Sequence, residues 1–120
     1  MNVYTSYYAN LSRDLKGLVP VAISTSVPQW FPWIVEEMRV LVPGWNLVNG
    51  IKSGVITSDE YTECYLKKLN QLDKASIWVE LENISKRNDN RDLVLLCYER
   101  RGEFCHRHIV ANWLGGVNEL

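Results

Sequence analysis

The sequence has 120 residues and a formal net charge of −1, and 47% of its residues are hydrophobic while 22% are charged. This composition excludes an intrinsically disordered chain, and the length suits a single domain over residues 1–120. The near-zero charge argues against bulk binding of nucleic acid, which requires a large basic surface.

The start of the chain predicts a strand, a short helix and a second strand. Residues 2–8 are rich in β-forming side chains, and residues 18–25 form a short apolar run with many β-branched side chains, so both are expected to be strands. Between them, Asn10 is expected to cap a short turn of helix that Gly17 ends.

The next segments are rich in prolines and glycines. Residues 26–33 form a proline-punctuated loop that carries three aromatic side chains. Residues 34–42 predict a helix that stops before Pro43. Residues 43–54 contain three glycines and are expected to be irregular.

A capping box marks the start of the following helix. Thr57 is expected to cap the helix, and Glu60 to reach back to the backbone N–H of Thr57. Apolar side chains spaced by four, four and three residues then fall on one face, which we expect to be buried. This face consists of Tyr61, Tyr65, Leu69 and Leu72.

The rest of the chain alternates helices with strands. We expect a helix over 74–85, a fully apolar strand over 93–97, a helix from Cys105 to the glycines at 115–116, and a short strand over 117–120. Such alternation predicts a parallel sheet covered on both faces. The expected fold is a single three-layer α/β domain with a small, mostly parallel sheet flanked by helices, Rossmann-like but without the dinucleotide-binding fingerprint.

Sequence features also bear on the compartment. The chain has no basic segment followed by an apolar one, so no signal peptide is expected. No apolar run approaches the ~20 residues of a membrane-spanning helix, so no membrane contact is expected. Together with an odd number of cysteines, three, these features predict a reduced, cytoplasmic protein.

The most informative segment is LVLLCYERRGEFCHRH, residues 93–108, where a buried strand runs into a polar loop and a helix. Ligands of parallel sheets bind beyond the carboxyl ends of the strands, so this loop lies where a site is expected. The unpaired N–H groups of the helix start and the guanidinium groups of Arg100, Arg101 and Arg107 favour a bound phosphate or carboxylate.

Both cysteines of this segment are candidates for chemistry. A thiol at a helix N-terminus among arginines is stabilised as the thiolate, so Cys105 is a candidate catalytic nucleophile. The alternative is that Cys105 packs under the loop. Cys97, at the strand end, is a further site candidate, although its position also fits a buried, inert thiol.

Glu99 and the histidines supply acid–base groups. Glu99 fits a general base, or an acceptor for a hydrogen bond from a ribose or a base edge. His106 or His108 fits proton transfer near neutral pH, and His106 is also a candidate ligand contact. The alternatives are that Glu99 only pairs with Arg107 or caps the helix, that His108 is a plain surface residue, and that the charged loop is simply solvated.

Aromatic side chains offer a stacking surface for a ring. Tyr7 and Trp30 are the candidates for this role. For each of the five tryptophans and six tyrosines, core packing is the alternative.

Several common site patterns are missing from the sequence. The C-x7-C-H-x-H set that starts at Cys97 is not a standard structural zinc spacing, and an adjacent Cys-His pair at a helix start is expected to point in different directions, so no metal site is predicted. Only three residues separate Cys97 from Arg101, whereas the phosphatase loop has five. The sequence contains no glycine-rich phosphate loop and no G-x-S-x-G, and no cofactor is predicted.

A family resemblance runs through the full chain. The segments VYTSYYANL, VPVAISTSVPQWF, ITSDEYTECYLKKL and LLCYERRGEFCHRHIVANWL resemble a small-protein branch of the family called domain of unknown function four-eight-eight, found in bacteria and their phages. The resemblance implies a three-layer α/β domain with signature positions at Cys97, Glu99, Cys105, His106 and Arg107. Many members carry Asp-x-Arg after the second strand, where this chain reads Ile23-Ser24-Thr25-Ser26. The family has no agreed activity to carry over.

Two functions and one structural role remain open. The first function is non-catalytic binding of a small anionic, nucleotide-like ligand or of a partner, which the missing Asp-x-Arg favours. The alternative is an enzyme that acts on a nucleotide or on a nucleic-acid phosphate or base, with Cys105 or Glu99 doing the chemistry. The structural role is a hydrogen-bond network in which Glu99 and Arg107 tie the strand to the helix.

Overall fold

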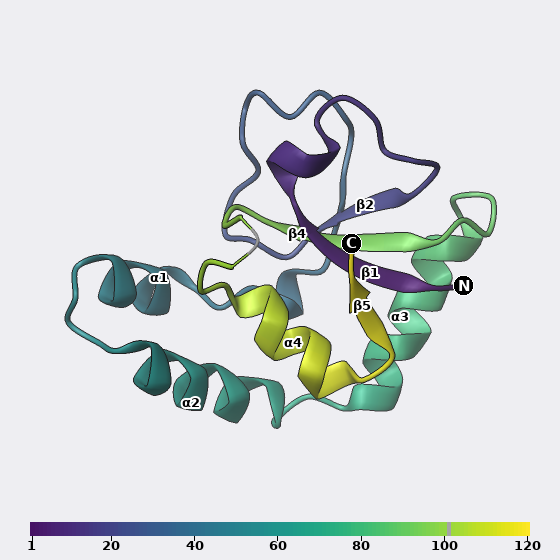
Figure 1. Cartoon of the computed structure of the whole chain (residues 1–120). Coiled ribbons are helices and arrows are strands. Elements are labelled where there is room, and N and C mark those ends of the chain that lie inside the picture. Colours follow the sequence, from purple (N-terminus) through teal and green to yellow (C-terminus); the bar gives the residue numbers. More distant parts are fainter. Residues whose placement is uncertain (101) are drawn as a thin grey trace.

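The computed structural model describes residues 1–100 and 102–120. Its strands form one sheet in which every pairing is parallel, with the order β3-β2-β4-β1-β5 (Figure 1). The prediction of a parallel sheet is therefore confirmed. The strands are β1 (Val3–Tyr7), β2 (Val19–Ala22), β3 (Glu36–Glu37), β4 (Leu93–Cys97) and β5 (Val117–Glu119).

The sheet lies between two covering layers, as the three-layer prediction requires. The four α-helices pack on one face (Figure 1), and the 3-10 helix η1 (Tyr8–Leu11) with the irregular chain up to residue 35 covers the other. The second covering layer therefore contains no α-helix in the described residues. The α-helices are α1 (Trp45–Lys52), α2 (Ser58–Leu69), α3 (Lys74–Lys86) and α4 (His106–Leu114).

Strand β4 is central because both of its faces are apolar. Leu93 and Leu95 belong to the larger core cluster under the α-helices, whereas Val94 and Leu96 belong to the cluster under η1. All five residues of β4 are buried, and the strand pairs with β1 on one side and β2 on the other. This alternation places Cys97, the last residue of β4, on the side of the helices.

The helix predicted over residues 34–42 is wrong. The chain instead forms the two-residue edge strand β3 and the 3-10 helix η2 (Arg39–Leu41). Sheet pairing overrides the helical spacing of the apolar side chains, because Glu36 pairs with Val21 of β2. The Glu36 carboxylate is then held from the far end of α3, where Arg87 Nη2 donates to it at 2.7 Å.

The irregular segment predicted over residues 43–54 is also wrong, because it contains α1. The glycines weaken the intrinsic helix preference, but Leu47 and Ile51 pack against the core and compensate. Gly50 lies close to Ile56, since a Cβ there would be 3.2 Å from the Ile56 side chain, which would have to shift by a few tenths of an ångström. Tertiary contacts that the local sequence does not contain therefore decide this helix.

The short helix predicted between Asn10 and Gly17 is replaced by η1, which begins and ends earlier. Asn10 does not cap it, and its side-chain amide donates to Ser6 Oγ at 3.0 Å. The capping box of α2 is confirmed, with Thr57 Oγ1 accepting from the Glu60 N–H at 3.1 Å and Glu60 Oε1 accepting from the Thr57 N–H at 2.9 Å. No helix in the described part of the chain is both long and apolar enough to cross a membrane.

Candidate functional site: a pocket beyond strands β2 and β4

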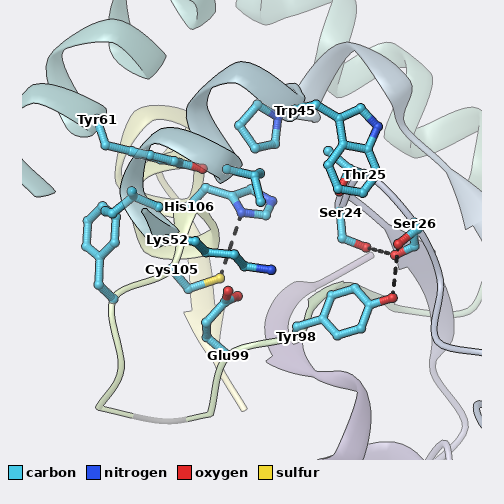
Figure 2. Close-up of a pocket in the computed structure, with 14 residues that line it drawn as sticks. Ser24, Thr25, Ser26, Trp45, Lys52, Tyr61, Tyr98, Glu99, Cys105 and His106 are labelled. Atoms are coloured by element: carbon cyan, nitrogen blue, oxygen red, sulfur yellow. Dashed lines mark hydrogen bonds between the residues drawn. The ribbon is translucent and has the colours of Figure 1, made fainter. Parts of the chain in front are cut away.

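A pocket of about 340 Å³ opens beyond the carboxyl ends of β2 and β4 (Figure 2). The two strands are neighbours, but β2 continues to β3 at one edge of the sheet and β4 continues through α4 toward β5 at the other. Adjacent parallel strands whose connections diverge in this way leave a crevice between them, and ligands of α/β proteins bind there. Helices α1 and α2 supply the remaining walls.

Aromatic side chains surround the mouth of the pocket. Trp45, Tyr98 and Phe104 line it and remain 57%, 43% and 40% exposed. Tyr61 of α2 is buried in the wall, where it packs edge-on against Phe104 with the ring centroids 5.1 Å apart. Exposed rings gathered around a concavity favour binding of a flat, partly apolar molecule.

The turn after β2 forms a polar wall. Ser24 Oγ donates to the Ser26 carbonyl at 2.6 Å, and its second contact is the Tyr8 hydroxyl at 2.7 Å. Since Ser24 has only one hydroxyl proton, Tyr8 must donate in that contact. Burial raises the pKa of Tyr8 to about 12, so the phenol keeps this proton at neutral pH.

Among the described residues, one carboxylate and one lysine reach into the pocket. In Figure 2 the side chains of Glu99 and Lys52 both extend into the space beside Cys105. The pKa of Tyr61 is raised mainly by burial and secondarily by the negative charge of Glu99, which indicates that the carboxylate lies near the phenol. The pocket thus presents both charges to a bound molecule.

His106, the first residue of α4, is locked in one orientation and one tautomer. Its Nε2 lies 2.6 Å from the carbonyl oxygen of Ile23, and because a carbonyl only accepts, Nε2 carries the proton. Burial lowers the pKa of His106 to about 4, so the imidazole is neutral near pH 7. The unprotonated Nδ1 faces Cys105 Sγ at 3.9 Å.

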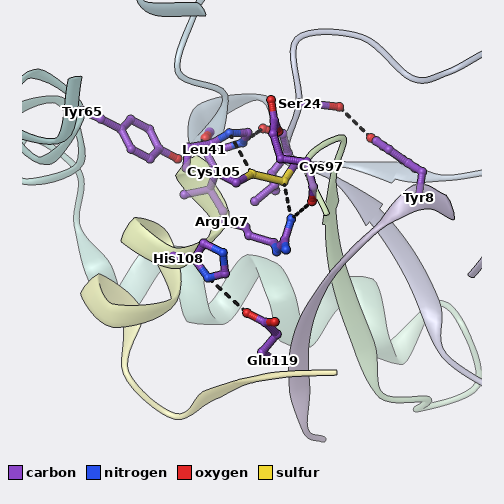
Figure 3. Close-up of a disulfide and its surroundings, with 12 residues drawn as sticks. Tyr8, Ser24, Leu41, Tyr65, Cys97, Cys105, Arg107, His108 and Glu119 are labelled. Atoms are coloured by element: carbon purple, nitrogen blue, oxygen red, sulfur yellow. Dashed lines mark hydrogen bonds and ion pairs between the residues drawn. A yellow bond between two sulfur atoms is a disulfide. The ribbon is translucent and has the colours of Figure 1, made fainter. Parts of the chain in front are cut away.

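Cys97 and Cys105 are joined by a disulfide that ties the end of β4 to the start of α4 (Figure 3). This differs from the expectation of a fully reduced chain, and only Cys64, which is exposed, is a free thiol. Cys105 becomes a nucleophile only after reduction. The two sulfur atoms and a ring nitrogen of His106 lie within 4.8 Å of one another, and this is the one group of three or more His, Cys, Asp or Glu side chains among the described residues that is close enough to hold a metal ion once the disulfide is reduced.

The adjacent Cys105 and His106 do not point apart, contrary to the sequence argument. Cys105 is the N-cap of α4 and has an extended backbone, with φ −151° and ψ 142°. This conformation, followed directly by a helical residue, turns the thiol and the imidazole toward each other. Tertiary placement of β4 then brings Cys97 to the same point.

Arg107 does not line the pocket. It is fully buried and donates to Cys97 Sγ at 3.2 Å (Figure 3). It also donates to the backbone carbonyl of Glu99 and lies 5.6 Å from the ring centroid of Tyr7. These contacts join α4 to the end of β4. The predicted ligand contacts of Arg107 and Tyr7 therefore stay predictions at positions outside the pocket lining.

The remaining predicted residues are scattered. Trp30 is 56% exposed and packs edge-on against Phe31, away from the pocket lining. His108 faces outward, with Nδ1 3.2 Å from the Glu119 carboxylate. Arg101 lies outside the described residues. Of the predicted site residues, the pocket brings together Glu99, Cys105 and His106.

Several pocket residues were missed by the sequence argument. Lys52 and Trp45 lie on α1, in the segment predicted to be irregular, and Tyr61 was predicted only as a core residue. A usable signal existed at Ser24–Ser26, because three polar residues directly follow a buried strand of a parallel sheet. The position of α1 over the pocket has no signal in the local sequence.

Comparison with known proteins gives one family. The family model DUF488-N3a, described as the active DUF488-N3 subclade, matches residues 12–116, a range that includes every residue of the pocket lining. No curated protein and no solved structure matches the chain. The match covers most of the 120 residues and confirms the resemblance inferred from the motifs. The chain therefore belongs to the DUF488-N3a family.

Proposed function

We propose that this protein binds a small nucleotide-like molecule in the pocket beyond β2 and β4. The observation that carries the proposal is the combination of exposed aromatic rings with the Lys52 ammonium and the Glu99 carboxylate around a concavity of about 340 Å³. A ring system with hydroxyl groups and an anionic tail uses all three kinds of contact. Pockets of a few hundred cubic ångströms suit ligands of this size.

Each group has a role in the proposed complex. Trp45 and Tyr98 both line the pocket (Figure 2) and provide faces on which a base can stack. Lys52 pairs with the anionic tail, and Glu99 accepts hydrogen bonds from ribose hydroxyls or from a base edge. In this proposal Lys52, and not the buried Arg107, binds the anionic group of the ligand.

Titration with nucleotides, monitored by tryptophan fluorescence, tests the proposal. We expect saturable quenching by a nucleoside phosphate, and a loss of affinity of about fivefold or more in Trp45→Leu, since stacking contributes ~1–3 kcal/mol per base. Trp30→Leu is the matched control, because Trp30 is equally exposed but lies outside the pocket lining. Equal losses in both variants, or no binding across a nucleotide panel, contradict the proposal.

A second pair of variants tests the anion contact. Lys52→Gln is expected to lower the affinity for a nucleoside phosphate but not for the corresponding nucleoside, since only the phosphate group pairs with the lysine ammonium. Lys86→Gln, an exposed lysine at the end of α3, should leave both affinities unchanged. An equal loss of affinity for the nucleoside would show that Lys52 supports the shape of the pocket and does not pair with the phosphate.

An enzyme remains the second candidate, in which Glu99 or the reduced Cys105 acts on a bound nucleotide. The description of the matching subclade as active favours a search for turnover, and the position of Glu99 inside the pocket favours it as the acid–base group. Incubation with nucleotides, followed by product analysis, should show conversion that Glu99→Gln abolishes. Saturable binding with unchanged ligand recovered at high protein concentration would support binding alone.

A further inference from the structure

We propose that the reduced protein binds one zinc-type divalent cation through Cys97 Sγ, Cys105 Sγ and His106 Nδ1. These three ligand atoms lie within 4.8 Å of one another, although they come from the end of β4 and the start of α4. Two thiolates and one imidazole select a borderline-soft ion such as Zn²⁺ and disfavour Mg²⁺ or Ca²⁺. This inference goes beyond the proposed function and does not require a nucleotide in the pocket.

The hydrogen bond of His106 supports the assignment. A metal-binding imidazole usually donates its second ring N–H to a carbonyl or carboxylate, which fixes the tautomer and the ring orientation. The Nε2–H of His106 donates to the Ile23 carbonyl at 2.6 Å, which leaves the lone pair on Nδ1, the ring nitrogen 3.9 Å from Cys105 Sγ. An edge-on contact with Tyr65, 5.7 Å between ring centroids, further restricts the ring.

Arg107 supports the thiolate form of the ligands. Its Nη1 donates to Cys97 Sγ at 3.2 Å, and a buried guanidinium beside a sulfur atom favours the negatively charged thiolate. Two thiolates with one divalent cation carry no net charge, which is also the charge of the disulfide. The net charge beside the buried Arg107 is therefore the same in the disulfide form and in the metal-bound form, so the surroundings of Arg107 suit both.

Three protein ligands leave a fourth coordination position. Cys105 and His106 line the pocket, so this position is reached from the pocket that contains Glu99 (Figure 2). Zinc sites that keep an open position bind water or a ligand there, whereas purely structural sites use four protein ligands. The cluster thus has the composition of an open site beside a ligand pocket.

The disulfide and the metal site are alternative states of the same two cysteines. A dithiol reductant supplies two electrons and two protons, converts the disulfide into two thiols and becomes a disulfide itself. The cation then displaces one proton from each thiol. No metal binds at this cluster while the sulfur–sulfur bond is intact.

Cobalt binding to the wild-type chain tests the proposal. After reduction with a phosphine and removal of excess reagent, we expect one Co²⁺ per chain, with the sulfur-to-cobalt charge-transfer absorption of thiolate ligands, and displacement of Co²⁺ by Zn²⁺. The oxidised chain, identified by its mass, should give no such absorption. The same spectrum from the oxidised chain, or no spectrum from the reduced one, would overturn the assignment.

Variants identify the ligands. Cys97→Ser and Cys105→Ser should each remove the charge-transfer spectrum, and His106→Gln should weaken binding by more than ~10-fold, since even outer-sphere partners have effects of that size. Cys64→Ser and His108→Gln are matched controls, because they alter the other cysteine and the other histidine. A spectrum that survives in Cys105→Ser, or vanishes in Cys64→Ser, contradicts the site. Nucleotide titration of the oxidised wild type tests the proposed function separately.

Discussion

Arg107 has the largest side chain that this fold buries completely. A buried guanidinium is stable only when hydrogen bonds replace its lost hydration, and here the Glu99 carbonyl and Cys97 Sγ accept from Nη1. The ring of Tyr7 adds a cation–π contact. At the residue scale, Arg107 therefore contributes to the junction between β4 and α4 whatever the pocket binds.

Replacing Arg107 should cost stability. Arg107→Gln removes a charge-assisted hydrogen bond and buried packing, so we expect the free energy of unfolding to fall by about 2–4 kcal/mol. Arg39→Gln is the control, because its contact with Glu37 is 3.7 Å long and largely exposed, and should cost no more than about 1 kcal/mol. Urea denaturation measures both, and equal losses would contradict the structural role.

The buried His106 makes stability depend on pH. In the unfolded chain the His106 imidazole is protonated below its ordinary pKa of 6.5. In the folded chain burial disfavours the charged ring and lowers this pKa to about 4. The free energy of unfolding of the disulfide-bonded protein should therefore fall by about 2 kcal/mol between about pH 7.5 and pH 5. The loss should be absent in His106→Asn and retained in His108→Gln when unfolding is followed by urea titration.

At the scale of single elements, α2 depends on its first turn. The capping box satisfies backbone donors at the N-terminus of α2, and the same turn leads directly into Tyr61, which forms a wall of the pocket. Loss of the cap therefore affects both stability and the shape of the site.

Removing the cap gives a measurable effect. Thr57→Ala should lower the free energy of unfolding by about 1 kcal/mol, because the Glu60 N–H loses its acceptor. Thr62→Ala, in the interior of the same helix, should change it little, since alanine favours helix there. Thermal unfolding of the two variants distinguishes a capping effect from a general effect of threonine removal.

The disulfide links two elements and should stabilise the fold when no metal is present. Cys97 and Cys105 are separated by 8 positions, and closing a loop of this size contributes about 2–3 kcal/mol by restricting the unfolded chain. Reduction in the presence of a chelator should lower the free energy of unfolding by that amount. Cys64→Ser should leave the effect intact, and an unchanged stability would mean that the bond does not form in solution.

At the scale of the whole molecule, the sheet joins segments that are distant in the sequence. Val3 of β1 pairs with Leu93 of β4, and β4 inserts between β1 and β2. Strand β1 pairs on both of its sides, whereas β5 pairs on one side only. The two ends of the described fold thus contribute unequally to the core.

Truncations test this inequality. Removing residues 1–8 takes away an internal strand and should leave a chain without a cooperative unfolding transition. Removing residues 117–120 takes away an edge strand, and should lower the melting temperature while keeping one transition. Calorimetry separates these outcomes, and a cooperative transition in the first truncation would contradict the central role of β1.

Sequence prediction succeeded where the pattern was local and strong. The apolar run predicted strand β4, and the capping box predicted the start of α2. The alternation of helices and strands predicted the parallel sheet. It failed at β3 and at α1, because pairing with β2 and packing on the core outweigh weak local preferences there. The predicted site residues divide in the same way. Glu99, Cys105 and His106 line the pocket, whereas Arg107 and Trp30 do not.

The sequence alone determined the fold class, the family resemblance and the place of the motif after a buried strand, because these depend on periodicity and on residues that are close in the chain. Only the tertiary structure decided that Lys52, Trp45 and Glu99 line one pocket, and that Cys97 lies beside Cys105 and His106. These contacts join segments from different elements, and their geometry depends on how helices pack on the sheet. No local pattern in the chain contains that information.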